Sequence, residues 1–184
     1  SFPTRRSSDL KLPEPPGKGT AAYLSVKYSH PAWLCEELVA LRGCDGAEAV
    51  LRANNETPPL FLQVNTLRAE ASRLAEKLGA RLLPEVPGCL ILNERTDVAS
   101  LQGFREGLFY VQDPAARMAV TMAGVRPGMK VLDACAAPGG KSFAAAIDMR
   151  DTGSVLAADI SGPKIRLVEE GARRLGLRTI TCEE

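Results

Sequence analysis

The stretch VLDACAAPGGKS, from Val131 to Ser142, limits the possible folds of this chain more than any other feature. A short apolar run leads directly into a glycine loop, which predicts a buried strand, a tight ligand-binding turn and the start of a helix. In parallel α/β sheets, ligands sit beyond the carboxyl ends of the strands, where helix N-termini attract polar groups. The stretch therefore predicts an α/β fold that binds a phosphate or a nucleoside.

The sequence around this loop alternates strands and helices. Asp113 is suited to cap a helix whose first position is Pro114, and apolar residues recur at helical spacing from Ile165 to Leu175. The loop is followed in turn by a helix, a strand, a second helix and a third strand: KSFAAAIDM, GSVLAADI, PKIRLVEEGARRLGL and RTITCEE. This order predicts the opening of a doubly wound parallel sheet over residues 106–184.

A smaller mixed α/β module is expected before this sheet, over residues 20–105. Its predicted elements are a helix from Pro31 to a stop at Gly43, a strand at 60–66, a helix ending at Gly79 and a short strand at 89–92. A further short strand is predicted at 107–113, beyond the module. Residues 1–19 are polar and rich in proline, and we expect them to be a disordered or foreign lead-in.

Composition excludes several classes of protein. The chain has 184 residues, of which 23 are basic and 22 acidic, so its net charge does not indicate nucleic acid. Its five cysteines are odd in number and none forms a CxxC pair, which argues against a disulfide framework and against a zinc site. No apolar run approaches the roughly 20 residues of a membrane helix, and we expect a cytoplasmic protein.

The glycine loop itself allows two interpretations. CAAPGGKS fits the P-loop pattern GxxxxGK[ST] except at the first position, where Cys135 replaces a glycine that helps the loop wrap around phosphates. Asp159, at the end of the next strand, is placed to accept hydrogen bonds from both hydroxyls of a ribose, and a P-loop enzyme has no need of that acid. A ligand that contains adenosine uses both features, and S-adenosylmethionine is such a ligand.

Four segments of the chain resemble one family. DACAAPGGK is similar to the cofactor motif of the RNA cytosine-C5 methyltransferases, specifically the bacterial RsmB type, also called Sun or Fmu. YSHPAWL, ANNETPPLFLQVNT and GFREGLFYVQDPAARMAV are similar to other segments of that family, in the same order and spacing. The resemblance covers residues 20–184, and four ordered matches are far more specific than a lone glycine loop.

The resemblance implies a fold, a cofactor and a site. The fold is α/β: the first half of a Rossmann-like S-adenosylmethionine-dependent methyltransferase domain, preceded by a small α/β module for RNA recognition. The cofactor is S-adenosyl-L-methionine, the partner is ribosomal RNA, and the protein is expected to be monomeric and to need no metal or membrane. The implied cofactor-binding residues are Cys135, Ala136, Ala137, Pro138, Gly139, Gly140, Lys141 and Asp159.

The implied reaction transfers a methyl group to carbon 5 of a cytosine in 16S ribosomal RNA, through a covalent adduct between a cysteine and the base. In the family, the two cysteines concerned lie in Pro-Cys and Thr-Cys motifs on later strands, whereas this chain ends at Glu184. We therefore expect no catalytic residue within the chain, which is interpreted as an inactive fragment. Its start, SFPTRRSSDL, matches nothing in the family.

Other residues have plainer interpretations. Cys135 is expected to be a packed small residue, and His30 a structural hydrogen bonder without a basic role. Asp133 is expected to fix the loop by accepting amide hydrogen bonds, and Lys141 to contact the cofactor carboxylate. Three functions stay open from the sequence: a ribosomal RNA methyltransferase, a degenerate P-loop protein, and a noncatalytic fragment that binds cofactor or RNA.

Overall fold

A computed structural model describes residue 15 and residues 17–92 and 96–184 of the chain. The expected lead-in, residues 1–19, falls largely outside the described residues. The chain divides into two compact units on either side of the junction between Pro58 and Pro59. No helix among the described residues is both long and apolar enough to cross a membrane.

The first unit contains two helices, α1 (Ala21–Tyr28) and α2 (Ala32–Asn54). Thr20 caps α1 by accepting a hydrogen bond from the Tyr23 amide at 3.2 Å. The stop predicted at Gly43 is an interruption: Gly43 has non-helical angles, with φ of 69°, and helical structure resumes beyond it. A core of five buried residues joins the two helices: Tyr23, Leu24, Cys35, Ala47 and Leu51.

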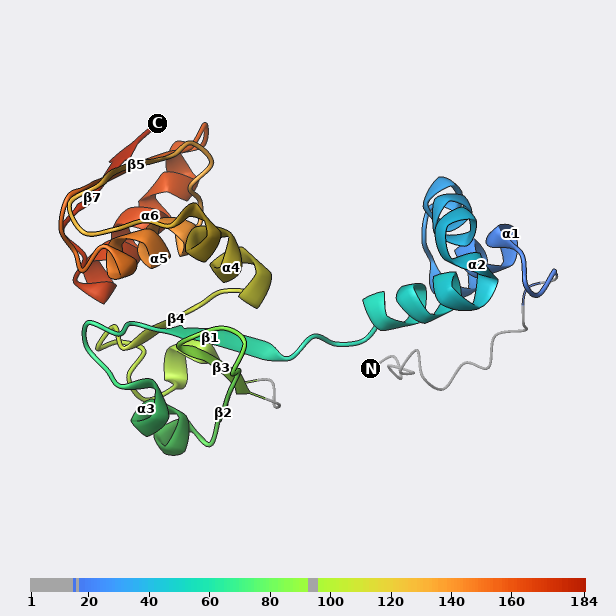
Figure 1. Cartoon of the computed structure of the whole chain (residues 1–184), viewed down its shortest axis with the longest axis horizontal. Helices are drawn as coiled ribbons and strands as arrows, with labels where there is room; N and C mark the ends of the chain where they lie inside the picture. Colours follow the sequence, from blue (N-terminus) through green and yellow to red (C-terminus); the bar gives the residue numbers. More distant parts are fainter. Residues whose placement is uncertain (1–14, 16, 93–95) are drawn as a thin grey trace, which may run out of the picture. The chain divides into compact units, whose positions relative to one another are not determined.

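The second unit begins with an antiparallel sheet of four strands in the order β2-β3-β1-β4. Its elements are β1 (Leu60–Val64), α3 (Ala71–Leu78), β2 (Arg81–Leu82), β3 (Cys89–Leu92), the short 3-10 helix η2 (Val98–Ser100) and β4 (Phe109–Val111). β4 lies beyond the module boundary expected at residue 105, yet it pairs with β1, with Val64 opposite Phe109. The sheet packs its core, which includes Leu62, Leu90 and Phe109, against α3 (Figure 1).

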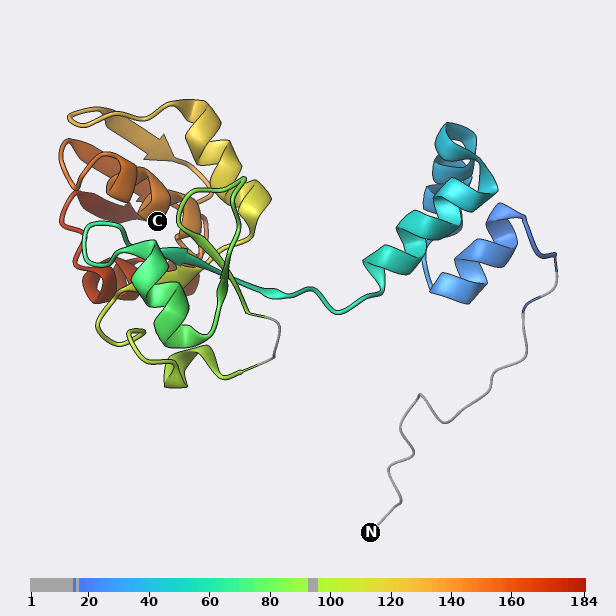
Figure 2. The ribbon, with the colours of Figure 1, turned by 60° about the horizontal axis from the view of Figure 1, so that its bottom comes forward.

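The rest of the second unit is a parallel sheet in the order β5-β6-β7, as the sequence predicts. Its elements are α4 (Pro114–Ala123), β5 (Lys130–Asp133), α5 (Gly140–Asp148), β6 (Ser154–Ala158), α6 (Gly162–Leu175) and β7 (Ile180–Glu183). Asp113 caps α4 as predicted, because its side chain accepts hydrogen bonds from the amides of Ala115 and Ala116. Figure 2 shows this part turned so that α4 and β5 can be followed.

A polar seam joins the antiparallel sheet to α6. Asn65 is fully buried, and its Nδ2 donates to the carbonyls of Gly107 and Leu175, each at 3.0 Å. Arg174 of α6 donates to the carbonyls of Phe104 and Phe109 at 2.6 and 3.0 Å, and its guanidinium lies 4.0 Å from the centre of the Phe104 ring. The seam therefore holds the two sheets of the second unit in one arrangement.

Candidate functional site

The glycine loop connects β5 to α5 and is hydrogen-bonded to the end of β6. The Ala136 amide donates to the carbonyl of Ala158 at 2.9 Å, and the Ala137 amide donates to Oδ2 of Asp159 at 3.1 Å. The peptide bond between Ala137 and Pro138 is cis. The loop is therefore held over the carboxyl ends of two adjacent strands, where α/β folds bind their ligands.

Asp159 contacts the loop from the end of β6. Its Oδ1 also accepts a hydrogen bond from the Ser161 amide at 3.2 Å, so each carboxylate oxygen has one partner from the backbone. A carboxylate oxygen has two lone pairs, which leaves each oxygen able to accept one more hydrogen bond. The half-buried carboxylate thus holds the loop and keeps two acceptor positions.

Asp133 holds the first turn of α5 and not the loop, contrary to the expectation. Its Oδ2 accepts a hydrogen bond from the Ser142 hydroxyl at 2.7 Å, rather than from loop amides. Ser142 is 1% exposed. In a P-loop this hydroxyl would bind Mg²⁺, so its burial against Asp133 speaks against the nucleotide-hydrolysing interpretation.

Gly139 ends the loop and has a φ of 108°, a conformation that favours glycine. A side chain at this position would collide with the ring of Phe143. The same ring would collide with a side chain at Gly171 of α6, and it also lies edge-on to Tyr110, with ring centroids 5.7 Å apart. Phe143 therefore fixes how closely the loop and α6 approach.

A cavity of about 590 Å³ lies beside the loop. Six of the eight predicted cofactor-binding residues line it: Cys135, Ala136, Ala137, Pro138, Gly140 and Lys141. Gly139 and Asp159 do not line it, although Asp159 is bonded to the loop at Ala137. The cavity also has walls from β4, from the start of α4 and from α6, with Val111, Ala116 and Leu167 among the lining residues.

Cys135 is not a packed residue, because it is exposed and lines the cavity. Burial raises the pKa of Cys35, Cys89 and Cys182, which keeps these thiols protonated. His30 is structural as expected, since its Nδ1 lies 2.7 Å from the Tyr28 carbonyl.

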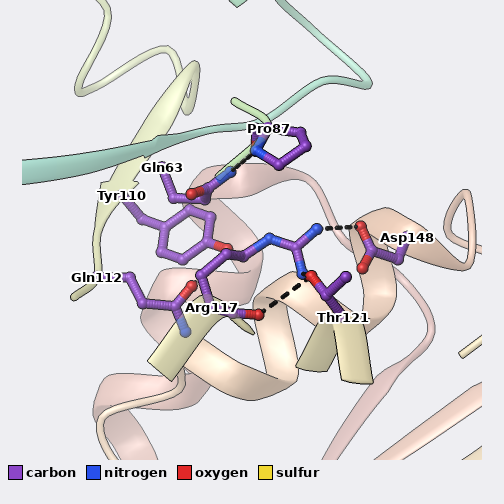
Figure 3. Close-up of polar contacts among 7 residues, drawn as sticks. All are labelled: Gln63, Pro87, Tyr110, Gln112, Arg117, Thr121 and Asp148. Carbon is purple, nitrogen blue, oxygen red and sulfur yellow. Dashed lines mark hydrogen bonds and ion pairs between the residues drawn. The ribbon is translucent and has the colours of Figure 1, made fainter. Parts of the chain in front are cut away.

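Two side chains of the cavity, Tyr110 and Gln112, are not predicted from the sequence. The Tyr110 hydroxyl donates to Oε1 of Gln112 at 3.2 Å, and beside this pair Arg117 forms an ion pair with Asp148 at 2.7 Å (Figure 3). Neither Tyr110 nor Gln112 carries a charge, and neither belongs to a known ligand-binding pattern. Their one sequence signal is that both lie in the segment GFREGLFYVQDPAARMAV, which is similar to a segment of the family.

Two protein-family models match the chain. One is the ferredoxin-like domain of RsmF/B-like methyltransferases, which matches residues 30–99. The other is described as 16S rRNA methyltransferase RsmB/F and matches residues 120–184. The two matches lie on either side of β4, in the order that the sequence resemblance predicted.

Curated relatives of the chain are named ribosomal RNA small subunit methyltransferase B. The chain is 37% identical over 158 residues to the ribosomal RNA small subunit methyltransferase B of Pseudomonas syringae pv. tomato, covering 83% of this chain and 35% of the relative. It is 32% identical over 164 residues to the probable ribosomal RNA small subunit methyltransferase B of Bacillus subtilis, covering 87% and 37%. The chain thus spans little more than a third of the length of these relatives.

Solved structures share the fold. A methyltransferase homolog protein from Pyrococcus horikoshii matches with a TM-score of 0.79 at 23% identity, covering 89% of this chain and 55% of that one. NSun6 from Pyrococcus horikoshii, solved with SFG, matches with a TM-score of 0.76 at 16% identity, covering 84% and 65%. The α/β fold, with a Rossmann-like part after a ferredoxin-like module, is confirmed. With both family models and these relatives in agreement, the chain belongs to the RsmB/F family of 16S rRNA methyltransferases.

Proposed function

We propose that this chain carries the cofactor-binding part of an S-adenosylmethionine-dependent methyltransferase that modifies carbon 5 of a cytosine in small-subunit ribosomal RNA. Family membership supports the reaction and the RNA, and one structural observation supports the cofactor. The glycine loop is bonded to a carboxylate at the end of the neighbouring strand, beside a cavity of about 590 Å³. That volume lies within the range of small-molecule sites, roughly 300–1,000 Å³.

The residues present fit this cofactor. Asp159 keeps one acceptor position on each oxygen, which suits the two hydroxyls of a ribose. Lys141 is exposed at the start of α5, where the unbonded amides and the helix dipole favour a negative group such as a carboxylate. When bound, S-adenosylmethionine supplies an electrophilic methyl group to the reaction.

In this proposal the loop residues act by shape and by their backbone. Cys135, Ala136, Ala137 and Pro138 form one wall of the cavity, and Gly139 lets the chain turn tightly into α5. Small side chains in this wall leave space for a ligand to approach the backbone. The cysteine that attacks the base and the second cysteine that assists release are proposed to lie outside residues 1–184, and the proposed role of this chain is to bind and orient the cofactor.

A second hollow supports the RNA partner. Arg68, Arg173 and Arg178 line a hollow of about 560 Å³ near the end of α6, together with the acidic Glu169. All three arginines are exposed, and guanidinium groups bind phosphates through paired hydrogen bonds. We propose that this hollow contacts the RNA backbone, which a net charge of +1 does not reveal.

Calorimetric titration of the chain with S-adenosylmethionine, and separately with ATP and magnesium, tests the cofactor. We expect S-adenosylmethionine to bind, and Asp159→Asn to weaken binding by at least about tenfold, or roughly 1.4 kcal/mol. Asp151→Asn is the matched control, because Asp151 also accepts backbone hydrogen bonds, but from Arg178 and Thr179 and not from the glycine loop. ATP binding that is insensitive to Asp159 would contradict the proposal.

A further inference from the structure

Gln112 leaves one buried polar atom without a partner. Its side chain is 6% exposed and lines the cavity, and its Nε2 has no hydrogen-bond partner among the described residues. A buried donor without a partner is destabilising, so such groups are rare in folded proteins. The atom therefore indicates a ligand acceptor at this point of the cavity.

The orientation of this amide is set by Tyr110. The Tyr110 hydroxyl donates to Oε1 of Gln112 at 3.2 Å, which directs Nε2 away from Tyr110 (Figure 3). Tyr110 is itself 3% exposed and its ring lies against Phe143, so the hydroxyl is held in place. The donor of Gln112 is thus held in position before any ligand arrives.

The donor lies next to the positive end of α5. A side-chain carbon at Gly140, the first residue of α5, would lie 3.2 Å from Nε2 of Gln112. The first amides of a helix have no acceptor within it, and the helix dipole adds positive potential there. Lys141 follows on the same turn and lines the same cavity. Donors and positive charge therefore gather at one end of the cavity, which favours an anion.

From this arrangement we infer that Gln112 recognises the carboxylate of the cofactor's amino-acid tail, by donating a hydrogen bond from Nε2. The inference rests on the proposed function, and it adds a residue that distinguishes this cofactor from other adenosine ligands. The carboxylate is the one anionic group of S-adenosylmethionine. Asp133 and Glu170 line the cavity too, so a tail that also carries an ammonium group fits better than a phosphate.

Three ligands that share an adenosine thioether separate the contribution of the carboxylate to binding from that of the rest of the ligand. They are S-adenosylhomocysteine, its decarboxylated analogue, and 5′-methylthioadenosine, which lacks the whole tail. We expect Gln112→Met to weaken the binding of S-adenosylhomocysteine by at least about tenfold, equivalent to roughly 1.4 kcal/mol. The affinities of the other two ligands should not change. Gln112→Glu places a negative charge beside the carboxylate. It is expected to weaken the binding of S-adenosylhomocysteine alone, and by more than Gln112→Met does.

Gln63→Met is the matched control. Gln63 is another buried glutamine, 3% exposed, with one side-chain atom lacking a partner, but it donates to the Pro87 carbonyl and does not line the cavity. It should leave the binding of all three ligands unchanged. Tyr110→Phe serves if Gln112→Met does not fold: it keeps the amide, removes its anchor, and should weaken S-adenosylhomocysteine selectively, to a smaller extent.

Equal losses for all three ligands, or no loss for S-adenosylhomocysteine, would overturn the inference. Asp159→Asn separates the inference about Gln112 from the proposed function. All three ligands carry the ribose, and all three should bind more weakly to that variant. If wild-type protein bound none of the ligands, or if Asp159→Asn changed nothing, the proposed function itself would be overturned, and the inference with it.

Discussion

Asn65 and Gln112 are both buried amides of the second unit, and they differ in how their hydrogen bonds are used. Asn65 donates to two carbonyls across the seam, and its Oδ1 accepts from the Leu67 amide at 3.2 Å. The side chain of Gln112 has one partner among the described residues, the Tyr110 hydroxyl, and its donor Nε2 has none. The first arrangement is complete without a ligand, and the second is not.

This difference separates residues that stabilise the fold from residues that keep a hydrogen-bonding group available for a ligand. The seam leaves no space, because a side chain at Gly107 would collide with the carbonyl oxygen of Arg174. The cavity keeps about 590 Å³ open between the loop, β4 and α6. Substitutions in the seam should therefore reduce the free energy of unfolding, whereas substitutions around the cavity should mainly reduce ligand affinity.

The largest expected effect is at the seam. Gly107→Ala should lower the free energy of unfolding by more than about 3 kcal/mol, because the added carbon meets backbone that cannot rotate away. Gly124→Ala is the matched control: Gly124 has a similar φ, 63° against 70°, but has no atom within 4 Å of the added carbon. It should cost about 1 kcal/mol. Urea unfolding checks both, and similar losses would show that the seam tolerates expansion.

Replacing each amide by an apolar residue of similar size sharpens the comparison. Asn65→Leu should cost about 2–3 kcal/mol in the free energy of unfolding, because it leaves the carbonyls of Gly107 and Leu175 buried without donors. Gln112→Met should cost less, about 1 kcal/mol, because it leaves only the Tyr110 hydroxyl without an acceptor and removes an amide donor that already lacks a partner. The comparison fails if urea melts show that Gln112→Met costs as much as Asn65→Leu.

A smaller effect should depend on pH through Tyr110. Burial raises the pKa of its hydroxyl above the usual value of about 10, so above that pH the folded chain holds a proton that the unfolded chain has lost. The stabilisation is complete below about pH 10 and is lost as the pH rises, at up to about 1.4 kcal/mol per pH unit. The urea midpoint should therefore fall faster at alkaline pH in wild type than in Tyr110→Phe. Parallel profiles would mean that Tyr110 titrates freely.

Much of this fold follows from local sequence signals. The cap at Asp113, the αL stop at Gly79 and the alternation of strands and helices after the glycine loop are all as predicted. β2 was missed because two exposed residues, Arg81 and Leu82, form no hydrophobic pattern. α1 was missed too: its eight residues contribute only two to the core, Tyr23 and Leu24, which is too few for a helical period.

The candidate site was harder to predict where it depends on distant contacts. The loop residues were predicted because their order is itself a pattern, and the structure brings six of them to one cavity. Gln112 could not be found in this way. Its importance arises from Tyr110 and from Gly140, which meet it only in the folded chain. The exposure of Cys135 likewise follows from the turn that carries it, and a residue type alone does not indicate it.

The packing of Phe143 has a consequence for variation among relatives. One aromatic ring covers Gly139 of the loop and Gly171 of α6, so a larger residue at either position requires a smaller one at position 143. Position 143 in turn cannot shrink without opening a gap between the loop and α6. These three positions, although far apart in the chain, are therefore expected to change together or not at all during evolution.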